Sequence, residues 1–189
     1  MRELALHILD VVENALKANA RHIELIVIED HTADRLTITV RDDGRGMDAE
    51  TVLKVRDPFY TTRKTRHVGL GIPLLDAAAE RCAGGLDIQS APGTGTTLTA
   101  TFQHSHIDRA PLGDMPSTLM GILLREQAFD LSYAHQIRVG ACHHTFELDT
   151  REIRQLLGDI PLATPAVRRW LGEYIAQGER GLEEKACLN

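Results

Sequence analysis

The feature that most constrains the fold is the change of hydrophobic period along the first 103 residues. Apolar residues recur at three- and four-residue steps in residues 2–19, which predicts a largely buried amphipathic helix. Two β-rich runs, residues 23–29 and 35–42, are expected to form an antiparallel pair. A short helix at 48–55, a longer one from 71 to about 84 and strands at 86–91 and 96–102 follow. This order predicts an α+β fold, a two-layer α/β sandwich with helices on one face of a sheet.

The pattern changes near residue 105. Residues 108–116 contain two prolines and a glycine, which is typical of a linker. A helix at 116–129, a hairpin at 131–148 and two helices, the last ending near Gly178, are expected beyond it. Five of the eight Phe, Trp and Tyr residues lie from Phe129 onward, enough for a small second core. We therefore expect a domain at 1–105, a linker at 106–116 and a small C-terminal α+β domain at 117–189.

Composition excludes several classes of function. Acidic residues outnumber Lys and Arg by 27 to 21, for a net charge of −6, which disfavours a nucleic-acid partner. No apolar run approaches a membrane span, and the start of the chain does not have the pattern of a signal peptide. Cysteines at only three scattered positions give no disulfide framework and fit a reducing compartment. These observations predict a cytoplasmic protein with no membrane partner.

A polar stripe runs along the first predicted helix and is made of Glu3, His7, Asp10, Asn14 and Lys17. It contains the first candidate chemical group. Asp10 and Asn14 lie one turn apart on it, at a four-residue spacing. An Asn side chain offers Mg²⁺ a neutral oxygen ligand, and a nearby carboxylate can orient or deprotonate an attacking water or hydroxyl. The alternative is an ordinary solvated helix face.

Three glycine-containing segments are further candidates. In residues 41–47 (RDDGRGM), an aspartate at a strand end could accept a hydrogen bond from an exocyclic amine, and glycines would let backbone approach a flat base. Residues 54–67 hold five basic residues and one acid and lead into VGLGI at 68–72, a suitable phosphate cradle at a helix N-terminus. Residues 93–97 (GTGTT) are the third glycine-containing segment. Taken singly, these segments are also explained as a turn, a solvated loop with a glycine cap and a hairpin turn.

Together and in this order, the segments resemble the gyrase, heat-shock chaperone, histidine-kinase and MutL class of ATPases, known as the GHKL or Bergerat fold. DVVENALKANA is similar to its N box and RDDGRGM to its D-x-G-x-G box. DPFYTTR with VGLGI is similar to its lid and second glycine box, and GTGTTLTATF to its last glycine box. The resemblance covers about residues 1–103.

The resemblance implies a role for each matching residue. Asn14 is the implied Mg²⁺ ligand, Asp10 activates the nucleophile, and Asp42 recognises the adenine amine. The other implied ATP-binding residues are Gly44, Gly46, Met47, Arg63, Lys64, Gly69, Leu70, Gly71 and Thr97. This sequence departs from the family pattern at Asp43, where Asn is usual, and at His67, where a glycine is common. Asp10 is shorter than the glutamate of hydrolysing members, so ATP binding is better supported than hydrolysis.

The resemblance implies ATP and Mg²⁺ as cofactors and a regulatory kinase or an ATP-driven switch acting on a protein partner or phosphoacceptor. A non-catalytic nucleotide sensor or an anti-sigma-type binding module is the alternative, and a homodimer stays open. His104-x-His106 and Cys142-His143-His144 lack a second ligand pair at a familiar metal-site spacing. We assign them structural or solvent-exposed roles.

Overall fold

The computed structural model describes residues 3–56, 70–125 and 127–187 of the 189-residue chain. Within them, one sheet has the strand order β3-β4-β2-β1-β5-β6. Its strands are β1 (His22–Asp30), β2 (Arg35–Asp42), β3 (Gly85–Ala91), β4 (Gly95–Gln103), β5 (Asp130–Val139) and β6 (Cys142–Asp149). Neighbouring strands are antiparallel except β1 and β5, which are parallel.

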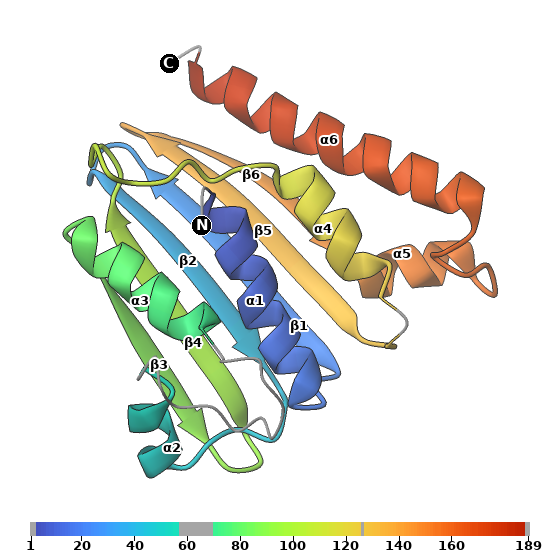
Figure 1. Cartoon of the computed structure of the whole chain (residues 1–189). Helices are drawn as coiled ribbons and strands as arrows, with labels where there is room; N and C mark the ends of the chain where they lie inside the picture. Colours follow the sequence, from blue (N-terminus) through green and yellow to red (C-terminus); the bar gives the residue numbers. More distant parts are fainter. Residues whose placement is uncertain (1–2, 57–69, 126, 188–189) are drawn as a thin grey trace.

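The helices are α1 (Leu4–Lys17), α2 (Ala49–Lys54), α3 (Gly71–Arg81), α4 (Met115–Leu123), α5 (Thr150–Leu157) and α6 (Pro165–Cys187). Figure 1 shows α1, α3, α4 and α6 lying against one face of the sheet. The predicted α+β sandwich is confirmed. Among the described residues, no helix combines the length and the apolar character needed to cross a bilayer.

The core lies between this helical layer and the sheet. Strand residues alternate between the two faces, so Ile23, Leu25 and Val27 of β1 are fully buried against the helices. On β2, Leu36, Ile38 and Val40 are likewise buried against the helices. The apolar stripe of α1 covers these side chains. The helical period of α1 and the two-residue period of β1 and β2 therefore both arise from side chains buried in this one layer.

The C-terminal segment does not build the separate second core that its aromatic content suggested. β5 extends the sheet beside β1, in a register from His22 opposite Asp130 to Asp30 opposite Arg138. Leu131 and Tyr133 belong to the same hydrophobic cluster as α1 and β1. Without β5, β1 would be an edge strand with unpaired backbone groups, so the pairing satisfies these groups and extends the existing core.

The segment expected as a linker is docked on α1. The side chain of Glu3 does not cap this helix, and its first amides need other acceptors. The amide of Leu4 donates to the carbonyl of Pro111 at 3.0 Å, and that of Ala5 donates to Leu112 at 2.8 Å. Residues 111–112 thus complete the start of α1.

Two helix boundaries differ from expectation. α4 ends at Leu123 instead of near 129, and α6 continues past Gly178 to Cys187. A Cβ at Gly178 would lie 2.1 Å from Cε2 of Phe146 on β6. Gly178 is therefore required where the helix meets the sheet, and it does not end the helix.

Candidate nucleotide-binding site

A cavity of about 670 Å³ lies where α1, α2, the end of β2 and the start of β4 meet. We call it the nucleotide cavity. Its walls are Val11, Asn14, Ala15, Lys17, Ala18, Val40, Asp42, Arg45, Gly46, Met47, Asp48, Thr51, Val55, Ile72, Pro92, Thr96 and Leu98. Parts of the N box, the D-x-G-x-G box and both later glycine boxes thus line one cavity, although they are far apart in sequence.

Asp42 is the strand-end acid in this cavity. It is the last residue of β2 and pairs with Thr96 of β4. Its Oδ1 accepts a hydrogen bond of 2.8 Å from the amide of Gly44. Burial raises the pKa of Asp42, and hydrogen bonds from the backbone of Gly44 and Thr96 offset this only in part. A half-buried carboxylate beside apolar walls is suited to accept a hydrogen bond from an exocyclic amine.

The glycines after Asp42 leave no room for side chains. A Cβ at Gly44 would lie 2.8 Å from Oδ1 of Asp42 and 2.9 Å from Cβ of Ala18. Gly46 has a φ of +65°, and its Cβ would lie 1.9 Å from the carbonyl oxygen of Ala91. These positions bring α1, the end of β2 and the β3–β4 turn together, and of the two glycines Gly46 lines the cavity.

Asp43, the departure from the family pattern, has a separate role. Its Oδ1 accepts the amides of Arg21 at 2.7 Å and His22 at 2.9 Å. Burial would raise the pKa of Asp43, but these hydrogen bonds outweigh it and lower the pKa. The side chain ties the end of β2 to the start of β1. An asparagine oxygen could accept the same bonds, so the Asp is compatible with this role.

Asp10 and Asn14 lie on the side of α1 that faces α3. Asn14 is exposed and lines the nucleotide cavity, and Asp10 is half-buried one turn before it. Gly71, the first residue of α3, packs on Asp10, because a Cβ there would be 2.8 Å from Cβ of Asp10. His7 of the expected polar stripe is instead buried, and burial lowers its pKa. The stripe is thus partly a helix–helix contact.

The remaining expected residues divide into three groups. Met47 lines the cavity, and its amide donates to Oγ of Ser90 at 2.8 Å. Leu70 directly precedes α3, makes no side-chain capping hydrogen bond and does not line the cavity. Arg63, Lys64 and Gly69 lie outside the described residues, so their expected positions near the phosphates stay predictions; His67, the second departure from the family pattern, lies outside them too.

Thr97 is one of the implied ATP-binding residues, but its neighbours Thr96 and Leu98 line the cavity instead. Thr97 is opposite Arg41, and successive side chains of a strand point to opposite faces. Applied to residues 96–98, this alternation could have identified Thr96 from the sequence. Arg45 and Asp48, also missed, carried no comparable signal.

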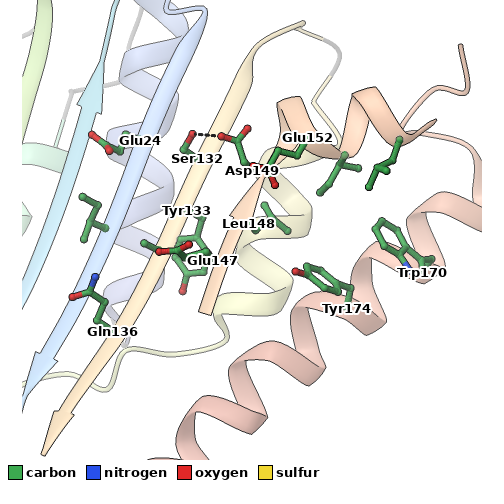
Figure 2. A pocket seen from close by; sticks show the side chains of 14 residues that line it. Glu24, Ser132, Tyr133, Gln136, Glu147, Leu148, Asp149, Glu152, Trp170 and Tyr174 are labelled. Carbon is green, nitrogen blue, oxygen red and sulfur yellow. Dashed lines mark hydrogen bonds between the residues drawn. The ribbon is translucent and has the colours of Figure 1, made fainter. Parts of the chain in front are cut away.

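A second cavity, of about 550 Å³, lies beside β5, β6 and α6 (Figure 2). Acidic residues line it, among them Glu24, Glu147 and Glu152, together with Trp170 and Tyr174. The two aromatic rings are stacked with centroids 5.6 Å apart. None of the expected site residues lines this cavity, and its negative charge is unsuited to a triphosphate. The nucleotide cavity is therefore the candidate site.

A solved structure has a similar fold. It is described as the N-terminal domain of a DNA repair protein and matches 86% of this chain and 59% of its own, with a TM-score of 0.56 and 15% identity. This likeness concerns the fold alone.

Several curated relatives are sensor kinases. Sensor protein kinase FleS of Pseudomonas aeruginosa is 40% identical over 92 residues, which is 49% of this chain and 23% of that protein. Sensor histidine kinase YxdK of Bacillus subtilis is 33% identical over 99 residues, 49% of this chain and 30% of its own. Sensor histidine kinase YvrG of the same organism is 29% identical over 98 residues, which is 50% of this chain and 17% of that protein. This chain spans less than a third of each relative's length.

The match to a family model is broader than any of these alignments. Residues 2–106, which contain all four boxes, match the model described as histidine kinase-, DNA gyrase B- and HSP90-like ATPase. The chain belongs to this ATPase family.

Proposed function

We propose that the chain binds Mg-ATP in the nucleotide cavity and acts as a regulatory kinase or ATP-driven switch on a protein partner. Membership of the family implies ATP binding. The observation that supports the location of the site is that Asn14, Asp42 and Gly46 line one cavity of about 670 Å³. Asp42 would recognise the adenine amine, and Ile72 at the start of α3 marks the side from which the phosphates would be reached.

The donor groups on α1 fit a magnesium ion. Asn14 offers an exposed carboxamide oxygen at the cavity wall, and the carboxylate of Asp10 lies one turn away. Mg²⁺ prefers oxygen ligands and keeps several waters, so one protein ligand is sufficient alongside the phosphates. When bound, the ion would neutralise phosphate charge. Asn14 would hold it, and Asp10 would orient an attacking water or the hydroxyl or imidazole of an acceptor.

The similarity to sensor kinases supports a role in phosphate transfer or signalling, with a protein as the acceptor. This part of the proposal rests on relatives of which the chain covers less than a third. A non-catalytic nucleotide sensor is the alternative outcome.

Calorimetry followed by single-turnover assays tests the proposal. Titration of the whole chain with Mg-ATP should give saturable heat, and no heat beyond dilution at millimolar ATP would contradict binding. With γ-labelled ATP, label on a co-purified protein would support a kinase, and free phosphate would support a switch. Binding with neither product would replace both with the sensor.

A further inference from the structure

A cluster of two histidines and a glutamate lies at the end of the sheet opposite the nucleotide cavity. Glu29 is near the end of β1, His31 is in the turn to β2, and His104 directly follows β4. One ligand atom from each lies within 4.8 Å of those of the other two. Nε2 of His104 is 2.9 Å from Oε2 of Glu29, and the His31 and His104 ring centroids are 4.4 Å apart.

Backbone hydrogen bonds fix the segments that carry these side chains. The amide of His31 donates to the carbonyl of Arg138 on β5 at 2.9 Å. The amide of His104 donates to the carbonyl of Asp34 at 2.9 Å, and the carboxylate of Asp34 accepts the amide of Ser105 at 2.7 Å. The β1–β2 turn and the residues after β4 are thus held against each other, which places the histidines near Glu29.

A second layer of buried polar groups orients Glu29. Its Oε1 is 3.2 Å from Nε2 of His135, whose Nδ1 is 2.8 Å from Oε2 of Glu179 on α6. The hydroxyl of Tyr133 donates to the other oxygen of Glu179 at 2.8 Å. His135 is only 2% exposed. The carboxylate of Glu29 is therefore held between His135 on β5 and His104 after β4.

We propose that Glu29, His31 and His104 form a site for a divalent transition-metal ion, with Zn²⁺ the best match. Two imidazoles and one carboxylate are a donor set that zinc uses in proteins, with a further position left for water. Mg²⁺ prefers oxygen ligands and fits this set poorly. His31 is exposed, so its ring can rotate to close the remaining ligand distances to those of a zinc site.

This set is different from the sequence pair His104-x-His106. Nδ1 of His106 instead accepts a hydrogen bond of 3.2 Å from the amide of Asp108. The ligands come from three segments that only the sheet brings together. Buried partners that orient ligands are a general feature of metal sites, and the His135–Glu179 pair supplies one here. A bound ion would connect the β1–β2 turn to the start of the 104–114 segment and, through Glu29 and His135, to α6.

Metal titration of the untagged, nucleotide-free chain tests the site. Co²⁺ should bind at one equivalent per chain with visible absorption, and Zn²⁺ should displace it at micromolar concentrations. His31→Ala removes an exposed ligand without touching the buried pair and should weaken binding by more than about tenfold, because even outer-layer partners cost about that much. Zn²⁺ should also raise the melting temperature of the wild type and not that of His31→Ala.

Two controls separate this site from others. His143→Ala removes an exposed histidine of β6 outside the cluster and should bind the metal as the wild type does. Asn14→Ala removes the proposed magnesium ligand and should also leave Co²⁺ absorption intact, so failure of the ATP proposal does not decide this one. The proposal is overturned if the chain binds no Co²⁺ or Zn²⁺ at these concentrations. It is equally overturned if His31→Ala matches the wild type or if His143→Ala weakens binding as much as His31→Ala.

Discussion

Two adjacent aspartates show how differently neighbouring residues of this chain are used. Asp43 accepts two amides at the start of β1, and these hydrogen bonds lower its pKa. Asp42 points into the nucleotide cavity, and burial raises its pKa. The two neighbouring carboxylates therefore have different environments: Asp42 lines the cavity, and Asp43 holds the backbone at the start of β1.

The raised pKa of Asp42 leads to a prediction about pH. Between the ordinary aspartate pKa and its raised value, the folded protein binds more protons than the unfolded chain, so this group makes the fold more stable as pH falls. Adenine recognition needs the ionised carboxylate and should weaken over the same range. Calorimetry with adenosine, which has no phosphate to titrate, should show affinity falling with pH while thermal stability from this group rises.

The matched variant for this prediction is Asp42→Asn. It should show no slope in this window, because its amide does not titrate, and should bind adenosine more weakly than the wild type at neutral pH, because a neutral amide oxygen is a weaker acceptor than a carboxylate. Its preference for ATP over GTP should fall, because the amide can also donate to the carbonyl of guanine. If Asp42→Asn kept both the wild-type pH slope and the ATP preference, Asp42 would not be the recognition residue.

Asn14 gives a prediction about the metal. Asn14→Ala should weaken Mg-ATP binding by about tenfold or more, since a ligand is at least as important as the outer-layer groups of a metal site. Binding of ATP in EDTA should change little, because the cavity walls are otherwise unchanged. Equal losses with and without Mg²⁺, measured by calorimetry, would count against Asn14 as a ligand.

At the scale of elements, the contact between α6 and β6 depends on Gly178. Its missing side chain lets the ring of Phe146 pack directly on the helix backbone. α6 in turn supplies Glu179 to the buried His135. A helix that sequence patterns ended at a glycine is in fact held to the sheet through that glycine.

Gly178→Ala should therefore destabilise the protein by about 1–3 kcal/mol, the usual cost of overpacking a core. Gly181→Ala is the matched control in the same helix, because a Cβ there meets nothing within 4 Å. It should stabilise the protein by up to about 1 kcal/mol through helix propensity. Chemical denaturation of both variants measures the difference, and equal effects would contradict the proposed contact.

At the scale of the molecule, the sheet joins segments that the sequence divides. β5 pairs with β1, and residues 111–112 accept amides of α1. The residues after 106 therefore belong to the same sheet and the same hydrophobic core as the ATPase region, and they complete the start of its first helix. Any response of α6 to nucleotide or metal would pass through this shared sheet or through α4, which packs against both α1 and α6.

Isolated residues 107–189 should consequently lack a cooperative thermal transition, because β5 loses β1 and its apolar side chains lose their partners. Circular dichroism and hydrogen exchange would measure this, and co-expression with residues 1–106 should restore a folded complex. A sharp, reversible transition in the isolated segment would instead support the domain boundary expected from the sequence.

The sequence by itself determined the elements of the ATPase region and the order of its four boxes. This was possible because hydrophobic period, turn glycines and the Asp10–Asn14 spacing are local properties of the chain. Only the tertiary structure decided that β5 extends the sheet and that Glu29, His31 and His104 meet. Pairing between segments that are distant in sequence depends on which surfaces are buried together, and no local pattern specifies that choice.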